Sequence, residues 1–423
     1  MAELLSRRRS HQGKRNMTLS SANLSLDPMQ ISPFWDADAH QRLAAFADIR
    51  KHGDGVQYLE GADGSGAWSL TSYQAVRTVS RDPQTFSNTQ GFSLDDLPQH
   101  LLEMLGSIIA MDGPKHRNHR RLVQVAFSPR AIRQMTDYVG ILTDSIIDNI
   151  RQTRTFDFVE TVGAHLPFQV ISDLLDIPVD DRGRLRELID LILGVNDSDV
   201  SDVATSLNAA AEFFNYTIDL GKQRQAHPGD DITSQLMNAE VDGNRLTPIE
   251  FGSFVILLAA AGNDTTRTGL SWAMSLLSAN PDQKRNLAQN FEELNNNAIE
   301  EILRWSSPVL HMRRTATTDT QLGEHIIKKG AKVVLWYLAA NHDPTVFTDP
   351  HTFDIHRHNA REHVAFGAGG PHHCLGSGLA RMEMRVVLEK LLTSFPDIRA
   401  SAEPEVLRSQ FVHGIKTLPC TVD

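Results

Sequence analysis

The sequence contains very few cysteines. Only Cys374 and Cys420 occur among 423 residues, so a disulfide framework is excluded and a reducing compartment is expected. No apolar run reaches the roughly 18 residues of a membrane span. The longest candidate, 254–262, ends in Asn263 and Asp264. The N-terminus also has no apolar stretch like that of a secretory signal. We therefore expect a cytoplasmic protein without a membrane span.

Positive charge is also in short supply. Lys and Arg together number 41 against 52 Asp and Glu, which gives a net charge of −11. Proteins that bind nucleic acids neutralise phosphates, so this balance argues against a nucleic-acid partner. Hydrophobic residues at 41% and charged residues at 22% are typical of a globular protein with a large core. Residues 1–26 are rich in Arg and Ser, with Glu3 as their only acid, and we interpret them as a flexible tail.

Residues 27–423 are expected to form one domain, because no internal repeat and no long Gly/Ser/Pro linker divides them. The runs 56–59 and 67–70 flank a Gly-rich turn, which predicts a small hairpin. From about 98 to 305, apolar residues recur three and four positions apart, which predicts helices. The clearest examples are 132–150, 166–175 and 251–277. The predicted fold class is mainly α with small β-sheets.

The last quarter of the chain has a different pattern. Two short apolar runs, 325–327 and 333–338, are expected to pair as strands across Lys328-Lys329-Gly330. The stretch 341–370 is irregular and rich in Pro, Gly, Asp and His, and irregular stretches of this length are usually functional. A final helix is expected from about Leu375 to Phe395.

Cys374 closes this irregular stretch, after a segment with glycines at 367, 369 and 370. These glycines permit positive φ or a close approach of the backbone to another group. The cysteine is expected in the first turn of the final helix, where amide N–H groups and the helix dipole favour a thiolate.

Four interpretations of Cys374 follow. A buried structural cysteine is the commonest case. A zinc site with His372 and His373 fits poorly, because adjacent residues rarely converge on one ion. A catalytic nucleophile needs a base and an oxyanion site that the sequence does not indicate. An axial thiolate on haem iron needs only one cysteine and a close backbone, and this interpretation fits best.

A polar segment, Gly262 to Thr266, interrupts the apolar helix pattern of 251–279. Burying Asp264 there is costly unless it is paired, and such violations often mark functional places. Alternatively, Thr265 and Thr266 bond back to carbonyls four residues earlier while Asp264 reaches an arginine. The pattern alone leaves both readings open.

Several cations stand where they could hold an anion. His116 and Arg120 are four apart, so they share one helix face and could bind a carboxylate or phosphate. Arg314 is a further candidate. Most such charges are simply solvated, and Glu301 with Arg304 has the spacing of an ordinary helical ion pair.

The order and spacing of these features together resemble the cytochrome P450 family over about residues 30–420. The resemblance implies that Cys374 is the axial ligand of the iron of haem b. It implies that Asp264 and Thr265 deliver protons to bound O2, the cosubstrate. It places the following residues around the haem propionates: His116, Arg120, Arg314 and His372.

Two details of the resemblance concern support of the haem site. Glu301 and Arg304 match the family's E-x-x-R motif, whose further arginine partner is expected to be Arg357. Seven residues separate Phe366 from Cys374 where the commonest signature has six, which leaves open which residue packs over the sulfur.

The resemblance implies a haem-thiolate monooxygenase that acts on a hydrophobic small molecule, such as a sterol, terpenoid or fatty acid. Its electrons are expected from a separate iron–sulfur ferredoxin and an NAD(P)H-dependent ferredoxin reductase. The alternative is a haem-thiolate sensor or carrier without turnover. The pocket walls are expected from 93–110, 192–214, Ala261, Val309, Leu310 and 411–412.

Overall fold

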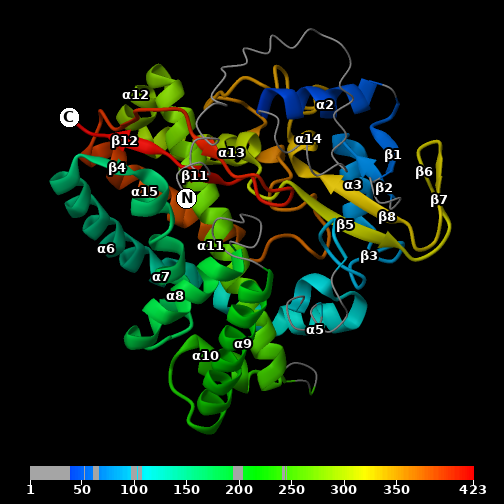
Figure 1. Cartoon of the computed structure of the whole chain (residues 1–423), viewed down its shortest axis with the longest axis horizontal. Helices are drawn as coiled ribbons and strands as arrows, with labels where there is room; N and C mark the ends of the chain where they lie inside the picture. Colours follow the sequence, from blue (N-terminus) through cyan, green and yellow to red (C-terminus); the bar gives the residue numbers. More distant parts are fainter. Residues whose placement is uncertain are drawn as a thin grey trace, which may run out of the picture.

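The computed structural model describes residues 39–51, 53–60, 66–96, 102, 107–193, 203–240, 243 and 245–423. The predicted tail, residues 1–26, lies outside the described residues. The fold is mainly helical with small sheets, as predicted. Most of the helices occupy one side of the molecule, while the largest sheet lies on the other side together with a few helices (Figure 1).

The helices are α2 Ala39–Lys51, α3 Tyr73–Arg81, α5 Gly113–Val123, α6 Pro129–Thr153, α7 Leu166–Leu174, α8 Val179–Leu193, α9 Val203–Ala226, α10 Ile232–Asn238, α11 Pro248–Ala279, α12 Pro281–Gln289, α13 Phe291–Ser306, α14 Tyr337–Asn341 and α15 Ser377–Ser394. Short helical turns are η1 Ser107–Ala110, η2 Gln124–Phe127, η3 Val159–Gly163 and η5 Ala360–Glu362. The strands are β1 Val56–Glu60, β2 Gly66–Leu70, β3 Phe86–Ser87, β4 Thr155–Asp157, β5 His311–Ala316, β6 Thr320–Leu322, β7 His325–Ile327, β8 Lys332–Trp336, β9 Arg399–Ala400, β10 Glu405–Val406, β11 Ile415–Thr417 and β12 Pro419–Thr421.

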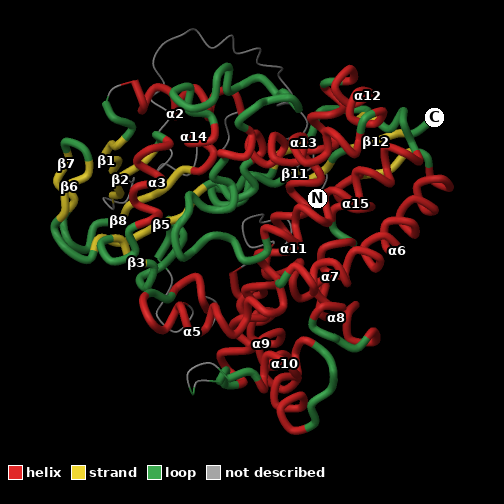
Figure 2. The backbone as a smooth tube through the Cα atoms, turned by 180° about the vertical axis from the view of Figure 1, so that it is seen from behind, coloured by secondary structure: helices red, strands yellow, loops and turns green. Residues whose placement is uncertain are grey.

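The long helix α11 runs through the middle of the helical side (Figure 2). Its start is well defined, because Thr247 and Glu250 form a reciprocal capping box and Pro248 occupies the first turn. It packs against α7, α9, α13 and α15. Most of its residues between Phe251 and Leu277 are buried, and the helix continues without a break through the polar segment that includes Gly262. The polar segment therefore does not interrupt the helix.

The largest sheet has the strand order β1-β2-β8-β5-β3. The predicted hairpin is confirmed, because β1 and β2 pair antiparallel with Val56 opposite Leu70. The pairing predicted between 325–327 and 333–338 is wrong. Strand β7 pairs instead with β6, across a tight turn at Gly323 with a φ of +59°. Strand β8 lies between β2 and β5, so its partners come from distant parts of the chain.

The irregular stretch before Cys374 is confirmed, with η5 as its short helical turn. Helix α15 begins at Ser377, three residues after the cysteine, so Cys374 is not in the first helical turn as expected. The Cys374 amide donates to the Phe366 carbonyl at 2.9 Å, which binds the cysteine to the preceding loop. Among the described helices, none combines the length and the apolar character needed to cross a bilayer.

Candidate functional site

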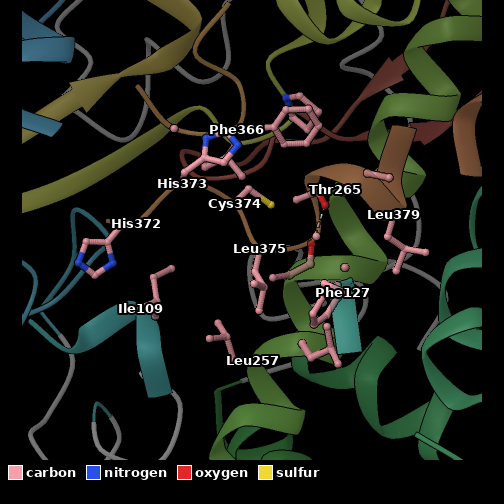
Figure 3. A pocket seen from close by; sticks show the side chains of 18 of the residues that line it. Ile109, Phe127, Leu257, Thr265, Phe366, His372, His373, Cys374, Leu375 and Leu379 are labelled. Carbon is pink, nitrogen blue, oxygen red and sulfur yellow. Dashed lines mark hydrogen bonds between the residues drawn. The ribbon is translucent and has the colours of Figure 1, made fainter. Parts of the chain in front are cut away.

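A cavity lies between α11, α5, η1, the start of β5 and the Cys374 loop. About 230 Å³ of it is open to the centre of a water molecule. Its walls are mostly apolar, and Figure 3 shows Ile109, Leu257 and Leu375 around the space next to Cys374. Apolar members of the wall include Ile108, Ile109, Leu257, Leu258, Val309 and Met312.

The glycines of the cysteine loop serve its packing on α3. Gly369 and Gly370 have φ values of +89° and +88°. A Cβ on Gly370 would lie 2.5 Å from the Ser80 carbonyl oxygen, and the Ser80 hydroxyl donates to the Gly369 carbonyl at 2.8 Å. Only glycine satisfies both the backbone conformation and this contact. At Gly369 and Gly370 the loop backbone therefore lies close to helix α3 of the protein itself.

The Cys374 sulfur faces the cavity, so it is accessible even though protein surrounds it (Figure 3). Burial raises the pKa of the Cys374 thiol, and the Gly376 and Ser377 amides and Arg120 only partly oppose this. The amides at the helix start thus favour the thiolate as expected, but burial outweighs them in the protein without a bound metal. Coordination to a metal ion deprotonates a thiol outright, so this chemistry is compatible with a ligand role.

Phe366 also lines the cavity and is held in place from behind. The Arg381 guanidinium lies 4.4 Å from the Phe366 ring centroid and donates to Glu300 at 2.6 and 2.9 Å. His363 Nε2 lies 2.8 Å from the same carboxylate. Burial raises the pKa of Glu300, but these two partners outweigh it and lower the pKa to about 2. Sequence analysis missed this network, since its members are far apart in the chain.

The structure brings the four predicted cations to the cavity wall: His116, Arg120, Arg314 and His372. The rings of His116 and His372 are 4.3 Å apart, and His372 Nε2 lies 3.3 Å from Asp112 Oδ1. Burial, with smaller contributions from His372 and Arg120, lowers the pKa of His116 to about 4. His116 is therefore neutral at pH 7.

Neither Arg120 nor Arg314 forms an ion pair with a carboxylate in the part of the chain that the structure describes. Arg120 donates to the His373 carbonyl at 2.6 Å, and buried Arg314 donates to the Arg313 carbonyl at 2.8 Å. Buried cations are costly without an anion, so the cavity fits a ligand with negative groups at this end. A haem, with one iron-binding face for Cys374 and two propionates, meets that requirement.

In the polar segment of α11, Thr265 and Asp264 make the local contacts of the alternative interpretation, in which they bond within their own helix. The Thr265 hydroxyl donates to the Ala261 carbonyl at 2.6 Å, and Asp264 pairs with Arg267 on the next turn. Thr265 lines the cavity, whereas Asp264 is buried and is not part of its wall. Burial raises the pKa of Asp264, with Arg267 opposing and Asp190 adding to the shift.

Glu383 is an acid in the cavity wall that sequence analysis missed. It lies on α15, is fully enclosed by protein, and contacts Thr266 of α11. Its Oε2 has no hydrogen-bond partner among the described residues. Burial raises the pKa of Glu383 to about 8, so the carboxyl is mostly protonated at pH 7. On α15, apolar residues recur at helical spacing on both sides of Glu383. An acid within this apolar stripe was the signal in the sequence that could have indicated it.

Behind the cysteine loop, the predicted partner Arg357 joins Glu301 and Arg304. Arg304 donates to Glu301 at 2.7 and 2.9 Å, and Arg357 Nε lies 3.0 and 3.1 Å from its two oxygens. Arg304 and Arg357 also donate to carbonyls of the irregular stretch, including Asn341 and Thr352. The motif therefore fastens that stretch to α13.

The predicted pocket walls are confirmed in part. Ile108, Ile109, Ala261 and Val309 line the cavity. Leu310 and residues 411–412 do not, because Leu310 points into the core beside the sheet and 411–412 pair with the backbone of the β5 entry. Residues 97–101, 103–106 and 194–202 lie outside the described residues, and the rest of 192–214 does not reach this wall.

Comparison with known proteins gives a consistent result. The family described as cytochrome P450 matches residues 198–412. The chain is 39% identical over 398 residues to a methyl-branched lipid omega-hydroxylase of Mycobacterium tuberculosis, covering 92% of both proteins. It is 35% identical to a steroid C26-monooxygenase of Mycolicibacterium smegmatis, covering 88% of both.

Solved structures agree with this result. A Mycobacterium marinum cytochrome P450 in complex with pseudoionone superposes with a TM-score of 0.87 at 34% identity. The match covers 96% of this chain and 100% of that one. The family binds haem through a cysteine thiolate and uses O2. The chain therefore belongs to the cytochrome P450 family and is a monooxygenase of that family.

Proposed function

We propose that this monooxygenase hydroxylates an aliphatic C–H bond of a hydrophobic lipid, with branched fatty acids and steroid side chains as the preferred class. The observation that carries this proposal is the apolar cavity that meets Cys374 at one end. Support for the lipid class comes from the names of the relatives, one a methyl-branched lipid hydroxylase and one a steroid monooxygenase.

We assign haem binding as follows. The Cys374 sulfur would ligate the iron, and Arg120 and Arg314 would provide the permanent positive charge for the propionates. Neutral His116 would donate a hydrogen bond to a propionate, and His372, which Asp112 orients, would lie beside it. Haem ligated by a thiolate supplies the oxygen chemistry, in which O2, two electrons and two protons yield the hydroxylated product and water.

The chain's remaining task is to move protons without admitting bulk water. Thr265 has its hydroxyl in the cavity wall, and Asp264 lies one residue earlier on the face turned toward Arg267. We assign Thr265 and Asp264 to proton delivery, with release of Asp264 from Arg267 as the step that frees the acid. We assign Glu383, which lines the cavity and contacts Thr266, as a second proton donor.

Electron supply is proposed to come from an iron–sulfur ferredoxin and an NAD(P)H-dependent reductase. Exposed cations on α5 and at the start of α6 suit an acidic partner: Lys115, Arg117, Arg121, Arg130 and Arg133. We also propose a cytoplasmic location, with residues 27–423 as the haem domain and residues 1–26 as a tail. The acid and hydroxyl groups of the cavity also favour turnover over the alternative of a sensor or carrier.

The first test is the absorption spectrum of the reduced protein with and without carbon monoxide. A strongly red-shifted Soret band is expected for the wild type, and its loss in Cys374→Ala but not in Cys420→Ala would assign the ligand. Titration with a methyl-branched fatty acid should then shift the iron spin state. A haem protein that binds no lipid, or binds lipid without forming product, would overturn the proposed function.

A further inference from the structure

Strand β5 has two faces with different tasks. Met312 and Arg314 line the cavity. Because side chains alternate along a strand, His311 and Arg313 point to the opposite side. Both are buried, and the loops 88–96 and 409–412 lie against them. The back of the cavity wall is therefore held by polar contacts (Figure 1 shows β5 between β8 and β3).

His311 joins the two loops through its ring. The Leu94 amide donates to Nε2 at 3.1 Å, and Nδ1 lies 2.9 Å from the Gln410 carbonyl. An amide N–H only donates and a carbonyl only accepts, so the imidazole carries its single proton on Nδ1. The ring packs between Trp336 and Phe411, with centroids 4.8 and 5.5 Å away. Burial also lowers the pKa of His311 to about 4, which keeps the ring neutral.

Arg313 reinforces the hold on the first loop. Its amide donates to the Phe92 carbonyl at 2.8 Å, and its guanidinium donates to the Gln90 carbonyl at 2.7 Å and to Asp96 at 2.6 Å. The side chain of Gln410 in the second loop donates to Asp95 in the first at 2.5 Å. The two loops are thus tied both to β5 and to each other.

The two loops support a part of the cavity wall from behind. Val309, just before β5, and Met312 on β5 line the cavity, and the second loop pairs with this segment through the Val309–Val412 bridge and the Leu310 amide, which donates to the Phe411 carbonyl at 2.9 Å. A displacement of the two loops would therefore move the wall that Val309 and Met312 form. The cysteine end of the cavity, by contrast, is held by α5 and the Cys374 loop, which make no contact with His311 through these bonds.

We propose that His311 is a positioning residue for substrate selection: by tying the loops 90–96 and 409–412 to the back of β5, it fixes the wall against which a long lipid chain packs. This inference rests on the proposed lipid hydroxylase function. It predicts that His311 affects binding of long substrates and leaves small ligands of the iron unaffected.

The test compares two ligands in the full haem-loaded chain by their Soret shifts. The Soret shift with a methyl-branched hexadecanoic acid measures binding against the cavity wall. The shift with imidazole, which needs only the iron, measures binding to the haem. His311→Phe keeps a ring between Trp336 and Phe411 but removes both hydrogen bonds. We expect the dissociation constant of the fatty acid to rise about tenfold and that of imidazole to stay within about twofold.

His342→Phe is the matched control. His342 is also fully buried, but its ring nitrogen bonds to the Leu338 carbonyl within its own helical turn and it does not line the cavity. We expect it to leave the ratio of the two dissociation constants unchanged. His311→Gln retains an acceptor toward Leu94, so its fatty-acid constant should rise only about threefold.

Two results overturn the inference. An unchanged ratio in His311→Phe, or an equal change in His342→Phe, would mean that His311 does not position the wall. If His311→Phe fails to bind imidazole, the ratio of the two dissociation constants is measured in His311→Gln instead. An unchanged ratio in that variant would also overturn the inference. If the wild type binds imidazole but not the fatty acid, the proposed lipid function itself fails, which is a distinct outcome.

Discussion

Two buried acids lie near the cavity, and their surroundings differ. Asp264 is paired with Arg267 and is turned away from the cavity, whereas Glu383 lines it with one oxygen unpartnered among the described residues. Burial raises the pKa of both. Thr265 and Thr266 are adjacent on α11, but Thr265 bonds to Ala261 while Thr266 contacts Glu383. The two proton-delivery routes that we propose can therefore be tested separately, one through Thr265 and one through Glu383.

Replacing Thr265 by Ala tests the first route. The variant should bind haem normally, because alanine is favourable in a helix and only the bond to Ala261 is lost. We expect product per NADH to fall about tenfold, with peroxide released instead. Coupling and peroxide yield are the measurements. Thr143→Ala removes a similar back-bond, to Val139 on α6 and away from the cavity, and should not uncouple. Unchanged coupling in Thr265→Ala would remove Thr265 from the relay.

Replacing Glu383 by Gln tests the second route through pH. The folded-state pKa of about 8 exceeds the ordinary 4.5, so ionisation opposes folding. Wild-type stability should fall as pH rises from about 4.5 to about 8, whereas Gln cannot ionise. The variant should gain stability relative to wild type, on the order of 4 kcal/mol by pH 9. Urea unfolding at pH 5, 7 and 9 measures this.

Coupling gives an independent check of Glu383. If its proton is used, Glu383→Gln should lower product per NADH at least about twofold at pH 7, because an amide cannot supply a proton. A parallel pH dependence of both proteins would show that Glu383 is ionised or exposed, contrary to its enclosed position.

At the scale of elements, local patterns predicted what local contacts build. The α11 pattern, the β1–β2 hairpin and the irregular stretch before Cys374 follow from periodicity and turn residues. The partners of β8 come from β2 and β5, which are far apart in sequence, so no local signal indicated them. Strand β5 was missed because its buried residues include His311 and Arg313, which break the apolar alternation.

The same distinction holds for the site. The structure brings the residues that motif spacing singled out to one cavity: Cys374, Thr265, His116, Arg120, Arg314 and His372. Motif spacing did not reveal that the Cys374 thiol is disfavoured as a thiolate by burial, because burial depends on the assembled fold. Glu383 was missed for the same reason, since only the packing of α15 against α11 makes it part of the wall.

The junction of α13 with the irregular stretch gives a prediction at this scale. Arg357→Ala would leave buried Glu301 with Arg304 as its only cationic partner and remove donors from the Thr348 and Thr352 carbonyls. We expect a loss of about 3–5 kcal/mol in the free energy of unfolding, with weaker haem retention. Urea denaturation of the haem-loaded protein measures both.

An exposed pair serves as the control for that experiment. Arg385 lies 3.4 Å from Glu292 at the surface, so Arg385→Ala should cost less than about 1 kcal/mol. Equal costs for the two arginines would show that the buried triad has no special role in holding the cysteine loop.

At the scale of the whole molecule, charge is unevenly distributed. The net charge is −11, yet α5 and the start of α6 expose five cations, four of which form no ion pair among the described residues: Lys115, Arg117, Arg130 and Arg133. Helix α5 also carries His116 and Arg120 on its buried face. A redox partner bound to the exposed face of α5 would therefore be one helix away from the proposed propionate ligands.

This arrangement predicts that reduction depends on salt and on the sign of charge at α5. Attraction between an acidic ferredoxin and these cations speeds association, and salt screens it over about 8 Å at 0.15 M. The ferredoxin-dependent reduction rate of the wild type should fall about tenfold between 0.05 and 0.5 M salt. The double variant Lys115→Glu/Arg117→Glu should lower the low-salt rate by a similar factor and flatten its salt dependence.

Arg285→Glu, on exposed α12, is the control and should change the reduction rate less than about twofold, because its charge lies away from α5. Dithionite reduction should be equal in all three proteins, since it requires no docking. A salt-independent rate in the wild type, or an equal loss in Arg285→Glu, would place the partner elsewhere on the surface.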